Sequence, residues 1–368
     1  MAERYEGREG REARAARNAR LVARRPFCVV SALVAAAALA CSPMEPGGGP
    51  ADPSLPPGRP PAAAPPANSV GGFDIELPPL TLAPGEEREI CYALPLVLRG
   101  PSRMVNAGVV TTGPGLHHGN ITTRARTGDG VRPCSSGGQA DIALEIASGG
   151  SVLFASSTQV QGSEWQSFPE GYAFRVGDDQ EVVARMHYLN ASSRPLVIAP
   201  RYQWFTVATT AVQVELGPFA WTYFKFHIPP RSTFTAQADC PLSRPMHLVQ
   251  ILPHMHGLGR RFTLSFLGGP RDGQPVLDLM NYGARGETDI RQFMPAVDLT
   301  QGGRGDGIRF ACSWENTFDK VIEFGVGDNE MCIAFGYAYP PADAASAAAS
   351  EDVDCLPIFP PTSPSPPT

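Results

Sequence analysis

Two histidines one residue apart are the sequence's clearest candidates for chemistry. His254 and His256 flank Met255, and in a β-strand residues i and i+2 point to the same face. The pair can therefore present two imidazoles to one metal ion. Pro253 before the pair and glycine-rich residues 257–259 after it predict a strand end that opens into a loop. Taken alone, such a pair is more often two histidines without a metal.

A methionine is the third candidate ligand for the same ion. Met331, followed directly by Cys332, lies 75 residues beyond His256. A thioether beside two imidazoles favours copper, because soft, uncharged sulfur suits Cu(I), whereas zinc sites use thiolate, imidazole and carboxylate. A lone methionine is more often core filler. Met331 therefore counts as a ligand only together with the histidines.

Three further histidines form a second candidate site. The chain has seven histidines. Besides His254 and His256 they include His117, His118 and His187, and only two others are left over. Neighbours on a strand point to opposite faces, so His117 and His118 can bind one ion only if the backbone bulges there. Three imidazoles without sulfur suit copper and zinc equally.

The position of His187 follows from a period of two. Residues 181–188 alternate, and Val182, Ala184 and Met186 form the expected buried face. His187 falls on the opposite face, where its imidazole can reach a metal ion.

The pattern of the whole chain predicts an all-β fold. Short alternating runs are separated by Gly, Pro, Asn and Asp, and no helical period is sustained outside the N-terminal segment. We expect two tandem antiparallel β-sandwich (jelly-roll-like) domains, residues 71–215 and 216–356. Residues 42–70, with ten Pro and four Gly, read as a disordered linker, and residues 357–368 as a disordered tail.

The N-terminus predicts export. Eight Arg and four Glu in the first 25 residues precede an apolar run that ends at Cys41 and is too short for a membrane span. We therefore expect a signal peptide over residues 1–41 and an extracytoplasmic location, in the periplasm or at the cell surface. The residues before Cys41 resemble a degenerate lipobox, so a lipid anchor and ordinary signal cleavage both stay open. Membrane contact is expected only through such an anchor.

Charge and cysteine content narrow the functional class. Without residues 1–40 the chain has 22 basic and 32 acidic residues, a net charge of −10, which disfavours nucleic acid as a partner. Of the eight cysteines, Cys28 and Cys41 belong to the expected signal segment, which leaves six. An even number of cysteines in an exported chain implies disulfides, although six cysteines allow fifteen pairings. The absence of a CxxC motif from the sequence disfavours zinc ribbons and thioredoxin-like redox sites. The six are Cys91, Cys134, Cys240, Cys312, Cys332 and Cys355.

Taken together, these motifs resemble the copper type II, ascorbate-dependent monooxygenases, the family of peptidylglycine α-hydroxylating monooxygenase and dopamine β-hydroxylase. The resemblance spans about residues 72–356. It implies two copper ions per chain, one in each domain, facing each other across a cleft. The implied ligands are His117, His118 and His187 for one ion, and His254, His256 and Met331 for the other. The implied disulfides are Cys91–Cys134, Cys240–Cys355 and Cys312–Cys332.

The resemblance also implies an activity. The copper held by His254, His256 and Met331 would bind O₂ and hydroxylate a C–H bond, and the other copper would pass on electrons from ascorbate or another small reductant. In the peptide-processing relative, three nearby side chains bind the peptide's carboxylate. The aligned positions here are Leu252, Ile333 and Phe335, which cannot donate hydrogen bonds, so we expect a small, neutral, apolar or aromatic substrate.

Two other functions remain open at this stage. One is an exported copper-binding or storage protein without oxygenase activity, and the other is a structural sandwich without metal. A blue-copper electron carrier is disfavoured, because the sequence has no Cys-x-His-x-Met cluster to supply a thiolate.

Overall fold

The computed structural model confirms the all-β fold over the residues it describes. Within them the only helices are two short 3₁₀ turns, η1 (Thr209–Ala211) and η2 (Gly269–Arg271). No helix of the described part is long and apolar enough to cross a membrane. The expected signal peptide and C-terminal tail fall outside the described part. The described residues are 58–135, 150–156, 160–177, 179–242, 244–282, 290–300, 306–325 and 328–341.

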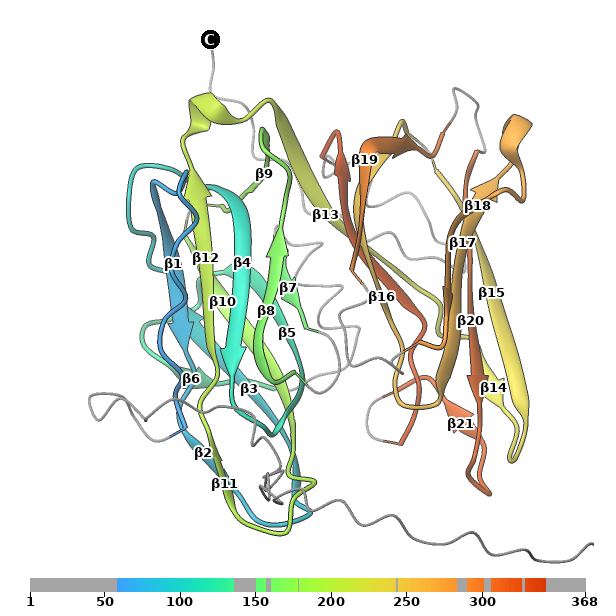
Figure 1. The fold of residues 1–368 in the computed structure, drawn as a ribbon, viewed down its shortest axis with the longest axis horizontal. Helices are drawn as coiled ribbons and strands as arrows, with labels where there is room; N and C mark the ends of the chain where they lie inside the picture. Colours follow the sequence, from blue (N-terminus) through green and yellow to red (C-terminus); the bar gives the residue numbers. More distant parts are fainter. Residues whose placement is uncertain are drawn as a thin grey trace, which may run out of the picture. The chain divides into compact units, whose positions relative to one another are not determined.

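The largest sheet has nine strands and runs through both halves of the chain (Figure 1). Its order is β1-β12-β4-β9-β13-β22-β16-β19, with β8 also beside β4. Its ladders are antiparallel except the one between β9 and β13. The strands are β1 (Gly71–Glu76), β4 (Met104–Thr112), β8 (Gly162–Ser167), β9 (Tyr172–Arg175), β12 (Arg201–Val207), β13 (Val214–Thr222), β16 (His247–His254), β19 (Arg291–Asp298) and β22 (Ile333–Tyr339).

Strand β13 joins the two halves of this sheet. Val214–Leu216 pair with β9 of the N-terminal half, and Gly217–Thr222 pair with β22 near the C-terminus. The domain boundary expected between residues 215 and 216 therefore falls inside a strand. The division into two tandem domains stays a prediction, because one sheet passes through that point.

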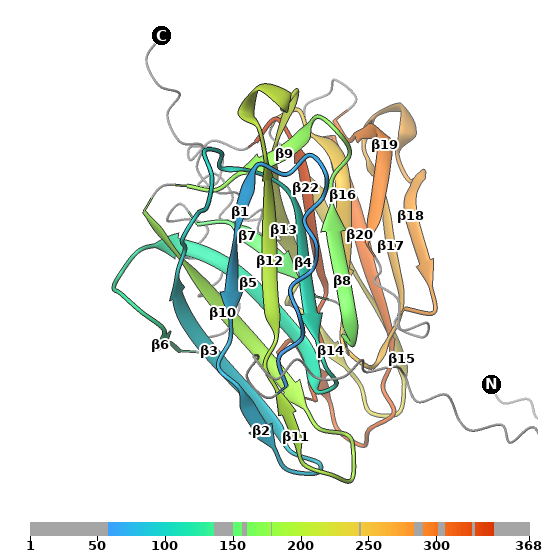
Figure 2. The same ribbon diagram turned by 60° about the vertical axis from the view of Figure 1, so that its left-hand side comes forward.

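Two further sheets complete the layers (Figure 2). One has the order β6-β3-β10-β5-β7, and the other β15-β20-β17-β18. The strands of the first are β3 (Glu87–Pro95), β5 (Leu116–Ala125), β6 (Arg132–Pro133), β7 (Val152–Ala155) and β10 (Gln180–Leu189). Those of the second are β15 (Thr233–Pro241), β17 (Gly259–Leu267), β18 (Pro275–Met280) and β20 (Gly307–Glu315). Two small ribbons pair β2 (Leu80–Leu82) with β11 (Leu196–Ile198), and β14 (His227–Ile228) with β21 (Ile322–Glu323).

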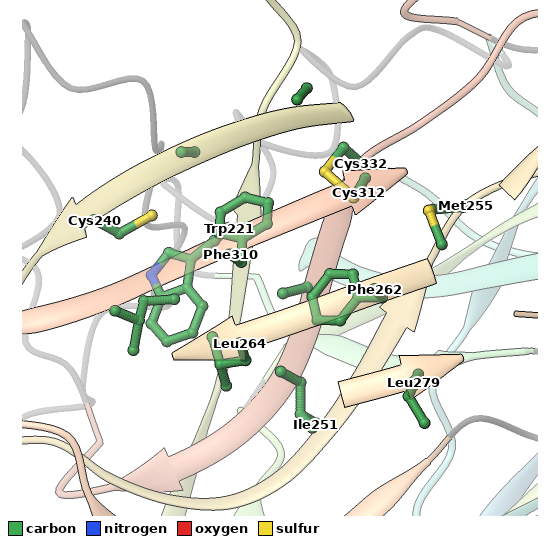
Figure 3. Packing of buried hydrophobic residues seen from close by; sticks show 14 of the residues in the cluster. Trp221, Cys240, Ile251, Met255, Phe262, Leu264, Leu279, Phe310, Cys312 and Cys332 are labelled. Atoms are coloured by element: carbon green, nitrogen blue, oxygen red, sulfur yellow. A yellow bond between two sulfur atoms is a disulfide. The ribbon is translucent and has the colours of Figure 1, made fainter. Parts of the chain in front are cut away.

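Each half has its own hydrophobic core. In the N-terminal half, Val182, Ala184 and Met186 of β10 pack into the core, as their alternation predicts. In the C-terminal half, the largest buried side chains include Trp221 and Phe310, which Figure 3 shows packed together. Burying one such side chain contributes about 1.5–3 kcal/mol. Two main cores thus lie on a shared sheet, and two buried side chains of the C-terminal half pack into the first of them.

The structure bears out two of the expected disulfides. Cys91 is bonded to Cys134, and Cys312 of β20 is bonded to Cys332, immediately before β22 (Figure 3). Cys240 is also disulfide-bonded, and its expected partner, Cys355, lies outside the described residues. Disulfides indicate a chain that folds in an oxidising compartment, which fits an extracytoplasmic location.

The last residues of the expected linker lie against strands of the N-terminal half. The guanidinium of Arg59 is buried, donates to the carbonyl of Leu77 and forms an ion pair with Glu76. The backbone N–H of Ala63 donates to the side chain of Gln203. A proline-rich segment forms few hydrogen bonds of its own, so side chains fix this stretch where its composition predicted disorder.

Candidate metal centre

The first histidine set is built on the pairing of β5 with β10. His118 lies directly opposite His187, and in the next pair Leu116 is opposite Tyr188, so His117 is the extra residue of a β-bulge. The bulge that the adjacent histidines required is therefore present. Nδ1 of His187 lies 3.2 Å from Nδ1 of His117 and 3.0 Å from Nε2 of His118.

These distances are close to those that one metal ion requires. Two nitrogens each about 2.0–2.1 Å from an ion, at a tetrahedral angle, lie roughly 3.3 Å apart. Nε2 of His187 donates to the carboxylate of Glu87 at 2.6 Å, so its Nδ1 keeps a free lone pair. Metal-ligating histidines typically make such a hydrogen bond through their second nitrogen. The three side chains could hold a metal ion.

The second set stands at the end of β16, as its flanking residues predict. Met255 is fully buried in the C-terminal core (Figure 3), so the two imidazoles beside it point to the other face. Nδ1 of His256 donates to the backbone carbonyl of Asn329 at 2.8 Å. Nε2 of His254 and Nε2 of His256 are buried, and neither has a hydrogen-bond partner within the described structure. Two ring nitrogens are thus available to a metal ion.

The two sets meet at His118. Its ring centroid lies 5.6 Å from that of His254 and 5.5 Å from that of His256, while His254 and His256 are 5.2 Å apart. The ring centroids of its own partners, His117 and His187, lie 5.2 and 4.8 Å from that of His118. The five rings form one cluster, whereas the resemblance implied two sites facing each other across a cleft. The rings pack at ordinary aromatic distances because uncharged imidazoles do not repel one another strongly.

Burial keeps the imidazoles of His117, His118, His254 and His256 uncharged. Desolvation, followed by the nearby imidazoles of His187 and His256, lowers the pKa of His117 to about 4. Desolvation likewise lowers the pKa of His254 to about 3, and it holds the pKa of His118 and of His256 below the usual value. The neutral form of histidine is the one that binds metals. The cluster is therefore ready to ligate near neutral pH.

Met331 lies next to this cluster. His254 is opposite Ile333 in the β16–β22 ladder, and the ring of His256 donates to the carbonyl of Asn329, two residues before Met331. Met331 is 5% exposed and shares an apolar cluster with Leu252, Ile333 and Phe335. The ring of Phe335 lies 6.2 Å from that of His254. All six predicted ligands thus come from segments that meet in one region.

Comparisons with known proteins give no family assignment. No family model matches this sequence, and no curated protein matches it.

The predicted substrate-binding residues lie together, but their space is filled. Val152 and Ala155 of β7 pack onto the apolar cluster that holds Leu252, Ile333 and Phe335. A cavity lined in part by Leu252, Phe335 and the two β7 residues has a volume of about 10 Å³. That is room for about one water molecule. The side chains expected to contact a substrate are in contact with the protein itself.

The residue that holds the second set in place was not predicted from the sequence. Glu330 is 1% exposed, and its carboxylate accepts hydrogen bonds from the backbone N–H groups of His256 and Leu258. Burial raises its pKa to about 7, although those hydrogen bonds oppose the rise. Its place directly before Met331 is the only signal in the sequence. A single carboxylate has no periodicity that would mark it as buried.

A tyrosine supports the same loop from another side. The hydroxyl of Tyr282 accepts from the backbone N–H of Met255 at 2.9 Å and lies 3.2 Å from the carbonyl of the same residue. The residue between the two histidines is therefore fixed by its buried side chain and by its backbone.

Proposed function

We propose that this protein is a copper-dependent monooxygenase that hydroxylates a C–H bond of a small, neutral substrate, using O₂ and ascorbate or another small reductant. One observation carries the proposal: five imidazoles from distant segments converge beside Met331, and buried ring nitrogens of His254 and His256 are left without partners.

The donor set favours copper over zinc. Neutral imidazoles and a thioether provide no negative charge, which suits Cu(I), whereas structural zinc sites commonly include thiolates. Bound copper would supply the redox chemistry and the activation of O₂. The protein holds the ligand rings in place: Glu87 accepts from His187, and the carbonyl of Asn329 accepts from His256.

The surroundings favour a neutral substrate. Leu252, Ile333 and Phe335 provide an apolar wall next to His254 and have no side-chain hydrogen-bond donor. A carboxylate buried there would lose its hydration without gaining a partner. A substrate larger than water needs Val152 and Ala155 to move aside, since both cover this wall.

The filled cavity supports a second candidate function. A copper-binding or storage protein without oxygenase activity needs the ligands but no space for an organic substrate. The cavity of about 10 Å³ beside Leu252 and Phe335 fits that role.

Copper content and coupled oxygen consumption together test these functions. The protein is loaded with copper, reduced with ascorbate without oxygen, analysed for metal and then given O₂ with a panel of neutral aromatic compounds. We expect two copper ions per chain and oxygen uptake that yields a hydroxylated product. Each turnover places one oxygen atom in the C–H bond and reduces the other to water, with two electrons from the reductant and two protons.

Other results would separate the alternatives. Bound copper without coupled uptake would favour storage, and a protein that binds no copper would refute both functions. A peptidylglycine hydroxylated faster than the neutral aromatic compounds would refute the substrate assignment alone.

A further inference from the structure

Glu330 is a buried carboxylate whose partners are N–H groups. Its Oε1 accepts from the backbone N–H of Leu258 at 2.7 Å. Its Oε2 accepts from the backbone N–H of His256 at 2.8 Å and from the indole of Trp314 at 2.9 Å. No ion pair to Glu330 is found among the described residues. Both oxygens are therefore used by donors from other segments.

These hydrogen bonds connect the segments that carry the second ligand set. His256 and Leu258 belong to the loop after β16. Asn329, Glu330 and Met331 are consecutive, and the first of them accepts from the His256 ring. The backbone of Glu330 is itself fixed, because its N–H donates to the carbonyl of Glu323 at 3.0 Å. The loop and the methionine segment are thus held to each other through one side chain.

A role in stability alone would not require a carboxylate here. Burying a charge is unfavourable, and an apolar side chain of similar size often stabilises a core better. An apolar side chain cannot accept two N–H groups from one loop, however. The specific contribution of Glu330 is the placement of His256 and Leu258 relative to its own segment.

We propose that Glu330 is a positioning residue that fixes the position of His256 relative to Met331, so that an imidazole and a thioether reach the same copper ion. The inference rests on the proposed copper binding by this set. Glu330 itself does not ligate, since its oxygens already accept from His256, Leu258 and Trp314.

The main test is Glu330→Gln, which keeps the shape but replaces one acceptor oxygen with an N–H₂ donor. One of the loop N–H groups then faces another donor. In the metal-free protein, we expect faster hydrogen exchange at the amides of His256 and Leu258. In the Cu(I)-loaded protein, we expect about 10–100-fold weaker copper binding and loss of the copper–sulfur contribution in X-ray absorption, because Met331 is the proposed sulfur ligand.

Glu181→Gln is the matched control. Glu181 is 0% exposed, but its carboxylate is bonded to the side chains of Arg124 and Arg132. This variant should lower stability and leave the exchange at His256 and Leu258 and the copper–sulfur signal unchanged. Glu330→Asp keeps both oxygens on a shorter side chain, so its hydrogen exchange and its copper affinity should lie between those of the wild type and of Glu330→Gln. It replaces Glu330→Gln if that variant does not fold.

The outcomes separate this inference from the function on which it rests. Wild-type protein that binds no copper would overturn both. Wild-type protein that binds copper, together with a Glu330 variant that has unchanged exchange and copper–sulfur signal, would overturn the positioning role alone. Equal changes in the Glu181→Gln control would also overturn it, since the effect would then be a general loss of stability.

Discussion

The two ligand sets are held by different means. His118 and His187 face each other in the antiparallel ladder between β5 and β10, next to the bulge at His117, so the backbone hydrogen bonds of the ladder fix their spacing. His254 ends β16, and His256 lies beyond it in a loop. That loop depends on Glu330, Asn329 and Tyr282. A ladder tolerates the loss of one side chain, whereas a loop held by few hydrogen bonds does not.

The comparison predicts that the two disulfides differ in their effect on the sites. Replacing Cys312 and Cys332 with Ala should cost about 2–5 kcal/mol of stability and also weaken the copper–sulfur signal, because Cys332 follows Met331. Replacing Cys91 and Cys134 should cost a similar amount without that second effect. Urea unfolding and X-ray absorption measure the two quantities. A free thiol at Cys312 or Cys332 in the wild type would contradict the prediction.

Met331→His should separate metal binding from reactivity. Imidazole keeps copper bound but favours Cu(I) less than a thioether does. We expect copper content near that of the wild type and turnover about 100-fold lower, equal to ~3 kcal/mol of barrier. Oxygen uptake at equal copper loading measures this. Met255→Leu is the control, because Met255 points into the core; full turnover in Met331→His would make Met331 a core residue only.

His118→Ala should weaken the binding of both copper ions, since the His118 ring is almost as near to the rings of His254 and His256 as to those of its own partners. We expect a loss of about tenfold or more in affinity at each set. His117→Ala and His254→Ala should each affect about one equivalent. Metal analysis after dialysis against a chelator makes the distinction. Loss of a single equivalent in His118→Ala would show that the sets act independently.

Glu87→Gln should have the smallest effect. The side chain of Glu87 is 52% exposed, and the β5–β10 ladder already fixes its partner, His187. We expect copper affinity to fall by only about tenfold or less, at the low end for an outer partner of a ligand. Copper titrations of this variant and Glu330→Gln give the comparison directly. A larger loss of copper affinity in Glu87→Gln than in Glu330→Gln would show that the first set, and not the second, depends more on its carboxylate.

Local patterns in the sequence predict the parts of this structure that depend on local geometry. Alternating runs predict strands, and the adjacent pair His117-His118 requires a bulge, which is present. The pairing of Cys312 with Cys332 came from a family resemblance and not from spacing. The closeness of His118 to His254 was not predictable, because it depends on how distant segments pack.

Other features were missed for the same reason. No local pattern tells which strand will pair with β13, so the shared sheet could not be foreseen. Leu252 and Phe335 were recognised as apolar neighbours of the histidines, but the residues that cover them, Val152 and Ala155, come from another part of the chain.

The path of β13 has a consequence for how the chain folds during synthesis. Gly217–Thr222 pair with β22, which ends at Tyr339, more than 100 residues later in the sequence. Strand β22 also separates β13 from β16 in the sheet. The large sheet can therefore close only after its last strand has been made, and until then β13 and β16 have exposed edges that can pair with other chains. Such long-range pairing predicts slow folding and a need for protection of the unfinished chain.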